Sequence, residues 1–327
     1  MEQTQSCPIN INFSDGTLTH WNAYTGNNKG GNGADAIKVV YDSSQSFSYG
    51  TIGAIALPEY NLPGVSGIRV ITNQGTDPFG NFETIPTING YAYHYSILLG
   101  STSVAQRQPG DQTNDPNNPP NNPSNGPQGG YVRGISYHIN VPAGPSTLPY
   151  TMTYAYAMVL ENGTHASLDQ PMARAIVSTP GGVIDCASPT YYLPTNGGLD
   201  SATARANGFS PSPVPSPNES RNQGSPGQHL QDVWTKGWTE VTFDLTPYRG
   251  QQVSLTFEAD NCVPGGHFAY AYFAIRDVCA GLQISGDTLA CSKSVLMYSI
   301  PSLDNASYDW SVPAGWIIDQ GSNSNTI

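Results

Sequence analysis

The sequence predicts an all-β fold, an antiparallel β-sandwich. Helical periodicity is nearly absent, and short runs of alternating apolar and polar residues dominate the chain. Gly, Pro, Asn or Asp bound each run, as turn residues do between strands. Only 11% of the 327 residues are charged, while Gly contributes 35, Pro 27 and Tyr 19. This composition is typical of extracellular β-proteins with long turns.

Ten runs have the pattern of strands. In the clearest, residues 150–160, large Tyr and Met side chains alternate with small Thr and Ala, which fits the interior of a layered sheet. The last, residues 267–275, has aromatic rings concentrated on one face. In chain order the predicted strands are 9–13, 36–41, 67–71, 91–99, 135–141, 150–160, 173–177, 238–245, 252–259 and 267–275.

Two segments interrupt the strand pattern. Residues 106–130 contain no large apolar side chain, so they cannot bury enough surface to offset the entropy of ordering. Residues 207–229 include S-P-S-P-V-P-S-P, the pattern of an extended Pro-rich loop. Strand patterns resume after each, so we expect two mobile insertions within one domain of residues 1–280. A new pattern then begins, and residues 281–327 are expected to form part of a second domain.

The net charge and the cysteine content limit the partners and the compartment that the chain can have. The net charge of −12 argues against nucleic acid and anionic membranes as partners, and no apolar run is long enough to insert into a membrane. Five cysteines form no C-x-x-C pair, so in an oxidising compartment two disulfides and one remaining cysteine are expected. Residues 2–8 do not resemble a signal peptide, and the chain is interpreted as a processed piece of a secreted protein.

Several motifs occur in the order found in one family. They are C-P-I-N-I-N-F-S-D-G-T-L-T-H-W at 7–21, Y-H-Y-S-I-L-L-G at 93–100, I-S-Y-H-I-N-V-P at 135–142, V-L-E-N-G-T-H-A-S-L-D-Q-P at 159–171 and D-N-C-V-P-G-G-H-F-A-Y-A-Y-F at 260–273. Together they resemble the N-terminal jelly-roll modules of bacterial surface proteins exported by type IX secretion, including gliding-type adhesins. The opening motif departs from the family at Ser14, where Glu is usual.

The tail, residues 299–327, resembles the first half of a PKD-like immunoglobulin-fold repeat. The resemblance therefore implies a jelly-roll β-sandwich, similar to galactose-binding and carbohydrate-binding modules, followed by part of an Ig/PKD-like domain in tandem. It also implies secretion to a bacterial cell surface and a role in adhesion or recognition.

The resemblance further implies a structural Ca²⁺ where the first and last strands meet. Asp15 and Asp277 are its candidate ligands, since Ca²⁺ takes oxygen ligands. The alternative is that Asp15 caps a turn and Asp277 pairs with a neighbour. If the two ends approach, Cys7 and Cys279 bond, Cys186 pairs with Cys262, and Cys291 remains, although four cysteines permit three pairings.

Sugar recognition would use aromatic faces surrounded by hydrogen-bonding groups. Tyr24, Tyr191, Tyr192 and Trp234 are candidates from their loop-like contexts, whereas Trp21 sits where the opening motif places a core residue. The alternative is that all of them are buried, because β-sandwiches bury most tryptophans.

His165 and His267 both match family positions and are expected to meet, as a buried hydrogen-bonded pair in preference to a metal site. No G-x-S-x-G, H-E-x-x-H or paired carboxylates on adjacent strands are present, so no catalytic residue is expected. The predicted function is non-enzymatic recognition of a glycan or a surface protein. The alternatives are an accessory carbohydrate-binding module of a polysaccharide-degrading enzyme and a structural spacer.

Overall fold

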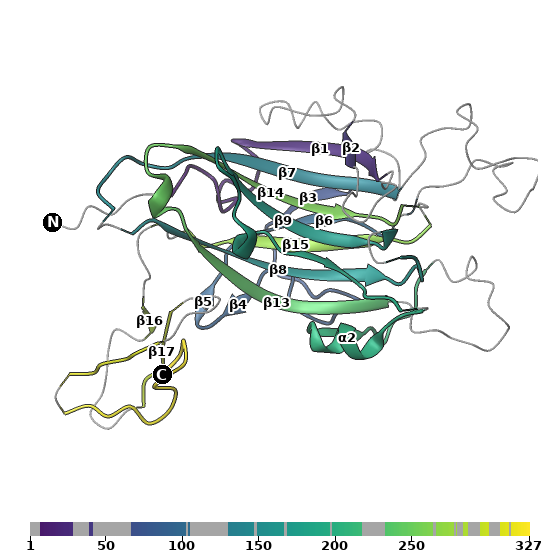
Figure 1. The fold of residues 1–327 in the computed structure, drawn as a ribbon. Helices are drawn as coiled ribbons and strands as arrows, with labels where there is room; N and C mark the ends of the chain where they lie inside the picture. The colour runs from purple at the N-terminus through teal and green to yellow at the C-terminus, as the bar shows by residue number, and fades with distance from the viewer. Residues whose placement is uncertain are drawn as a thin grey trace, which may run out of the picture.

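The chain folds into two facing antiparallel β-sheets (Figure 1). The computed structural model describes residues 7–28, 39–41, 67–102, 104, 130–146, 149–166, 169–196, 198–217, 233–263, 266–277, 279, 284–286, 295–300, 308–313 and 315–327. The predicted all-β class is confirmed, and within the described residues every strand pairing is antiparallel.

Sheet A has the order β10-β9-β14-β7-β1-β2, with β11 also paired to β9. Its strands are β1 (Trp21–Asn28), β2 (Val39–Tyr41), β7 (Gly130–Asn140), β9 (Met172–Thr179), β10 (Gly182–Val183), β11 (Thr190–Tyr192) and β14 (Gln252–Asp260). Sheet B has the order β12-β13-β8-β15-β6-β3. Its strands are β3 (Ile68–Ile71), β6 (Ser96–Gly100), β8 (Thr151–Glu161), β12 (Phe209–Pro211), β13 (Val233–Asp244) and β15 (Ala269–Ile275).

Aromatic rings fill the space between the sheets. Phe257 of sheet A stacks on Phe273 of sheet B with ring centroids 4.3 Å apart. Trp21 packs against Phe13 and Phe257, at centroid distances of 5.0 and 6.0 Å, and is fully buried. Trp21 is therefore the core residue that the opening motif predicts. Ring pairs of this kind add to the free energy gained from burial alone.

Two predicted strands differ from the structure. Residues 9–13 form successive turns instead of a strand, because Asn10 and Phe13 adopt left-handed backbone angles, with φ of 53° and 63°. The Asn10 amide holds these turns by donating to the Thr17 and Thr19 carbonyls. The run 91–99 is divided into the short β5 (Tyr91–Ala92) and β6, with three irregular residues between them.

Residues 207–217, the first part of the expected insertion 207–229, are more ordered than their composition predicts. A short helix, α2 (Ser201–Ala206), precedes them, with Asp200 capping the helix by accepting from the Thr203 N–H. Phe209 begins β12 and is 1% exposed. Burial of this one aromatic ring holds β12 against sheet B. Residues 218–229 and the other expected insertion, 106–130 apart from Gly130 in β7, lie outside the described residues.

The outer face of sheet B is covered by the segment around β4 (Thr87–Ile88) and β5. Phe79 and Phe82 of this segment pack on the rings of Tyr270 and Tyr272. Both tyrosine hydroxyls donate to the buried Asp77 carboxylate, at 2.9 and 3.1 Å. Sheet B therefore has apolar packing on both faces, which explains the large rings on one side of β15.

The tail contains a small sheet of β16 (Ser285–Gly286) and β17 (Tyr298–Ser299). Ser299 Oγ donates to the Asn89 carbonyl at 2.6 Å, a contact between the tail and the β4–β5 turn. Two 3₁₀ turns complete the described elements, η4 (Asp185–Ala187) and η6 (Thr246–Tyr248).

Candidate functional site

The outer face of sheet A has a polar half that remains accessible. Thr256 in β14 pairs with Ser136 in β7 and Ile176 in β9, so these side chains lie side by side. The described side chains of this half are half-buried or exposed, and most are short and polar; they are Asn22, Ser136, His138, Ile176, Ser178, Ser254 and Thr256. Unlike the outer face of sheet B, this surface offers hydroxyl, amide and imidazole groups to a ligand.

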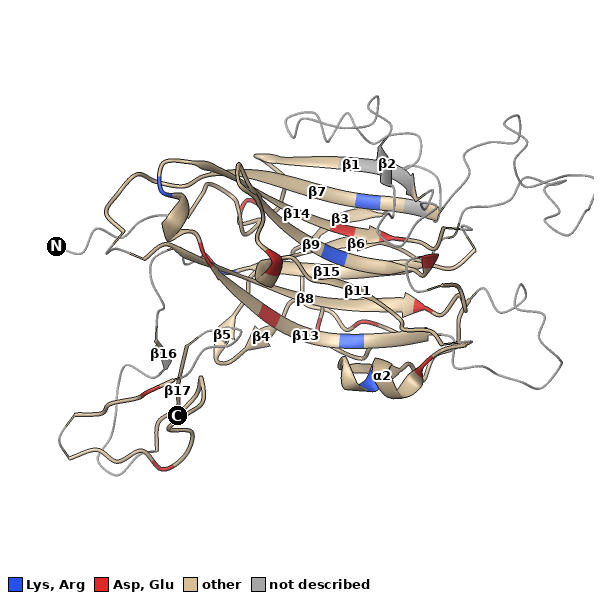
Figure 2. Cartoon of the chain, in the orientation of Figure 1, with Lys and Arg blue, Asp and Glu red and all other residues tan. Residues whose placement is uncertain are grey.

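A buried charged group borders the polar half. Arg174 in β9 is paired directly with Glu258 in β14. Its Nε donates to Glu258 Oε1 at 2.5 Å and its Nη2 also contacts that oxygen, while Nη2 lies 3.9 Å from Asp260 Oδ2. The Arg174 side chain is 18% exposed, whereas both carboxylates are fully buried. Figure 2 shows how few charged residues the strands of the two sheets carry.

Asp260 is the unusual member of the group. Neither of its carboxyl oxygens accepts a hydrogen bond from the described part of the chain. Burial, reinforced by the neighbouring Glu258 charge, raises its pKa well above the ordinary value, and Arg174 only partly opposes this. A protonated Asp260 donates to Glu258, whereas an ionised Asp260 would place two carboxylates together, so we assign the proton to Asp260.

The aromatic residues expected to bind sugar have different environments. Trp234 is 2% exposed and has the Arg205 guanidinium over its ring, so it is a core residue and its prediction as a sugar platform is wrong. Tyr191 points into the sandwich, where its hydroxyl lies 2.5 Å from that of Tyr156. Tyr192 is half-buried beside Met172 in β9, at the edge of sheet A. The side chain of Tyr24 lies outside the described residues, although its backbone pairs with Gly134.

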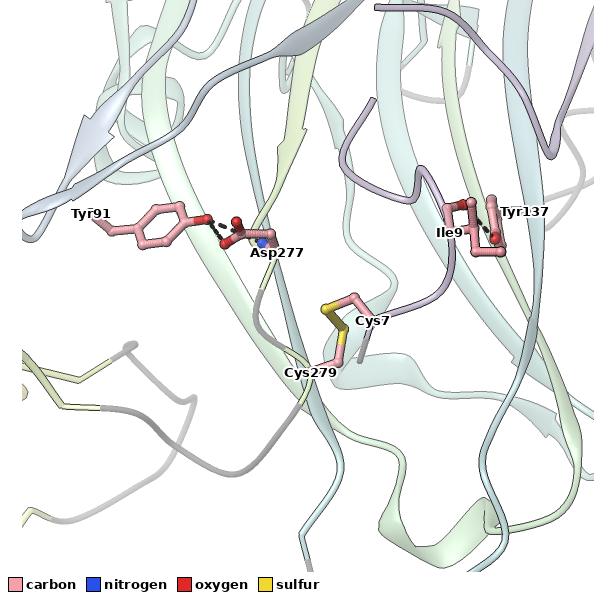
Figure 3. The surroundings of a disulfide bond; sticks show 6 residues. All are labelled: Cys7, Ile9, Tyr91, Tyr137, Asp277 and Cys279. Carbon is pink, nitrogen blue, oxygen red and sulfur yellow. Dashed lines mark hydrogen bonds between the residues drawn. A yellow bond between two sulfur atoms is a disulfide. The ribbon is translucent and has the colours of Figure 1, made fainter. Parts of the chain in front are cut away.

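The two expected calcium ligands already have protein partners. Asp15 Oδ1 accepts from the Thr17 N–H and hydroxyl, at 2.9 and 2.6 Å, which is the turn-capping alternative. Asp277 accepts a hydrogen bond from the Tyr91 hydroxyl, which in turn accepts from the Asp277 N–H (Figure 3). Ca²⁺ takes six to eight oxygen ligands. Among the described residues, no cluster of three acidic groups surrounds Asp15 or Asp277.

One expected disulfide is present. Cys7 and Cys279 are bonded, with Cα atoms 4.9 Å apart, and the bond ties the N-terminal segment to the end of β15 (Figure 3). Nearby, the Tyr137 hydroxyl donates to the Ile9 carbonyl at 2.9 Å and anchors the same segment to β7.

The other expected pairing, Cys186–Cys262, is wrong, and both residues are thiols. The N–H of Ile184, two residues before Cys186, donates a hydrogen bond to the carbonyl of Val177 in β9. Asp260, two residues before Cys262, instead pairs with Met172 at the other end of β9. Five strand residues span about 17 Å, far beyond the roughly 7 Å between Cα atoms that a disulfide tolerates. Cys291 lies outside the described residues.

His165 and His267 do meet, as expected from the family positions that they match. His165 Nε2 lies 3.1 Å from His267 Nδ1, and the half-buried rings are 5.0 Å apart between centroids. Burial lowers the pKa of His165, which favours the neutral imidazole. Cys262, buried and previously assigned to a disulfide, places its Sγ 3.4 Å from His267 Nδ1. Sequence reasoning missed this third member, although D-N-C-V-P-G-G-H places it five residues before His267.

Comparison with known proteins identifies the tail alone. Residues 278–327 match the family model of the PKD-like domain. No curated protein matches the chain. No helix among the described residues is long and apolar enough to cross a membrane.

A comparison with solved structures finds weak similarity to three of them. TmCBM61 in complex with β-1,4-galactotriose has a TM-score of 0.30 and 9% identity, covering 84% of this chain and 99% of that one. The enzymatically active domain of bacteriophage CBA120 tailspike protein 4 has a TM-score of 0.28 and 7% identity, covering 83% and 21%. A structure of promiscuous carbohydrate-binding modules from the β-sandwich superfamily has a TM-score of 0.27 and 9% identity, covering 81% and 59%. These scores are too low to indicate a shared function.

Proposed function

We propose that the chain is a non-catalytic recognition module of an extracellular bacterial protein, and that it binds glycans on the polar half of sheet A. The observation that supports this is the contrast between the two outer faces. Sheet B is covered by apolar packing, whereas sheet A presents short hydroxyl and amide side chains beside Arg174. Such a surface can hydrogen-bond many sugar hydroxyls at once.

Arg174 is the residue best placed to orient a ligand. Its contacts with Glu258 hold the guanidinium at the border of the polar half. A fixed guanidinium loses little entropy when it donates to a sugar oxygen or carboxylate. Thr256 and Ser136 lie in the adjacent row and supply hydroxyl groups that both donate and accept.

The wider setting supports an extracellular role. The Cys7–Cys279 disulfide requires an oxidising compartment, and the PKD-like match suggests a modular chain. More specifically, we propose that the module mediates adhesion at a bacterial cell surface after type IX secretion. Its partners in the same parent chain would be tandem PKD-like domains. A structural Ca²⁺ held by Asp15 or Asp277 belongs to the same proposal; each carboxylate would exchange its present hydrogen bonds for the ion.

A glycan array tests the proposal. Wild-type protein is expected to bind a defined subset of glycans, with at least tenfold weaker binding for Arg174→Ala and for Thr256→Leu. Ser210→Leu, on the exposed edge strand β12, is the matched control and should bind as wild type. Failure to bind any glycan, or equal binding by Thr256→Leu and wild type, would contradict the proposed face.

The same array tests whether glycan binding depends on a bound Ca²⁺. Binding is measured with a chelator, then after re-addition of Ca²⁺ or Zn²⁺ alone. Restoration by Ca²⁺ and not by Zn²⁺ supports an ion at Asp15 or Asp277, whereas binding that is indifferent to the chelator removes calcium from the proposal.

A further inference from the structure

The two imidazoles and the thiol of His165, Cys262 and His267 gather at one end of the sandwich, where the β8–β9 and β14–β15 connections meet. Their donor atoms all lie within 4.8 Å of one another, and within the described residues this is the one such group of metal-ligating side chains. We propose that these three side chains bind a divalent transition-metal ion, with Zn²⁺ as the ion of choice. This site is separate from the glycan face and from the expected calcium ligands.

The spacing of the donors fits zinc. With Zn–N bonds of about 2.0–2.1 Å and a Zn–S bond of about 2.3 Å, tetrahedral angles place two nitrogens about 3.3 Å apart and a nitrogen and sulfur about 3.6 Å apart. The observed distances are 3.1 Å between His165 Nε2 and His267 Nδ1, and 3.4 Å between Cys262 Sγ and His267 Nδ1. Only the separation of His165 from Cys262, at most 4.8 Å, has to shorten when the ion enters.

The chemistry of the donors selects the class of metal. A thiolate and two imidazoles are soft or borderline ligands, which suit zinc, whereas calcium and magnesium need oxygen. The backbone N–H of His267 donates to Cys262 Sγ at 3.2 Å, which holds the sulfur beside the His267 ring. Three protein ligands leave a fourth position for water or another ligand, and the half-buried histidines place that position toward solvent.

The backbone around His165 is shaped to bring the rings together. A Cβ on Gly163 would lie 2.7 Å from His165 Nε2 and 2.9 Å from His267 Nδ1, so only glycine fits beside the donors. Thr164 has φ of 54°, a left-handed conformation that is rare for a β-branched residue and occurs where structure imposes it.

Buried polar side chains hold this loop in place. Gln170, fully buried, accepts from the Gly163 N–H at 2.9 Å and donates to Asn162 Oδ1 at 3.0 Å. Thr195 Oγ1 donates to the His165 carbonyl at 2.9 Å. A loop held by such contacts presents its donors in one arrangement, as supporting residues do around known metal sites.

Cobalt titration of the chelator-treated full chain tests the site. We expect one Co²⁺ per chain, an absorption band from thiolate-to-metal charge transfer, and displacement of Co²⁺ by Zn²⁺. Cys262→Ser and His267→Ala should lose the band and bind at least about 100-fold more weakly, while Cys186→Ser should match wild type. Absence of the band in wild type, or its persistence in Cys262→Ser, overturns the proposal.

Two further measurements do not depend on removing a ligand. Gly163→Ala keeps all three donors but inserts a methyl group between the rings, and should bind Co²⁺ at least tenfold more weakly. X-ray absorption at the zinc edge of zinc-loaded wild type should report two nitrogen ligands from imidazole and one sulfur. A zinc coordination shell without sulfur would refute the assignment of Cys262 as a ligand, even if every variant failed to fold.

Discussion

Removal of the Cys7–Cys279 disulfide should cost much of the stability of the module. The bond closes a loop with a sequence separation of 272 residues. In the chain-entropy relation, a constant plus 1.5R times the logarithm of the loop length, this gives about 5.6 kcal/mol at 298 K. Measured disulfides reach about 5 kcal/mol at most, so we expect a loss of about 3–5 kcal/mol in the free energy of unfolding.

The assay is urea unfolding of Cys7→Ala/Cys279→Ala, followed by tryptophan fluorescence under non-reducing conditions. The m-value should rise, because the unfolded chain expands when the loop opens. Cys186→Ala, at an exposed thiol, is the control for cysteine removal and should stay within about 0.5 kcal/mol of wild type. A loss below about 1 kcal/mol in the double variant would refute the loop-closure argument.

Three other substitutions test buried polar groups. The raised pKa of Asp260 means that its contribution to stability is fully present below the unfolded pKa and declines as pH rises. Asp260→Asn should therefore stabilise the fold by about 1–3 kcal/mol at pH 7 in urea titrations, and a gain that does not shrink toward pH 4 would contradict the protonation argument. Glu240→Gln leaves the Arg276 guanidinium buried without its ion pair, and calorimetry should show a loss of about 3–5 kcal/mol; a change under about 1 kcal/mol would mean the pair contributes little. Burial raises the pKa of Tyr150 to about 12 and its hydroxyl has no hydrogen-bond partner in the described structure, so Tyr150→Phe should match or exceed wild type at pH 7 and gain stability relative to it between pH 10 and 12. Lower melting temperatures for Tyr150→Phe across that range would show that the hydroxyl has a partner.

The strands that the sequence predicted are those in which side chains of two kinds alternate. Residues 252–259 became β14 nearly unchanged, because apolar and polar side chains alternate along most of the run. Residues 150–160 became β8, which is buried on both faces, because large Tyr and Met side chains alternate there with small Thr and Ala. β1, with the sequence W-N-A-Y-T-G-N-N, was missed, since its second half, T-G-N-N, has no apolar residue to continue the alternation of a strand. Residues 9–13 alternate and yet form turns, because the positive φ angles of Asn10 and Phe13 depend on contacts that Asn10 makes up to nine residues away.

The candidate sites depend on strand register, which sequence does not specify. Arg174 and Glu258 lie 84 residues apart and meet only because β9 pairs with β14 in one register. No local pattern marks that pairing, and a shift of one residue in the register would place the two side chains on opposite faces of the sheet. His165 and His267 were predicted to meet only because a resemblance supplied the topology.

The positions of Cys262 and Cys279 at opposite ends of β15 explain why one is a thiol and the other is in a disulfide. Cys262 and His267 lie before this central strand of sheet B, and Cys279 lies just after it. Its seven residues span about 23 Å, so Cys262 cannot exchange into the disulfide at the far end without unfolding of the strand. Counting cysteines assumes that every thiol in an oxidising compartment needs a sulfur partner. At Cys262 the fold supplies two imidazoles instead, and a bound metal would keep that buried thiol from oxidation while fixing the start of β15 as the disulfide fixes its end.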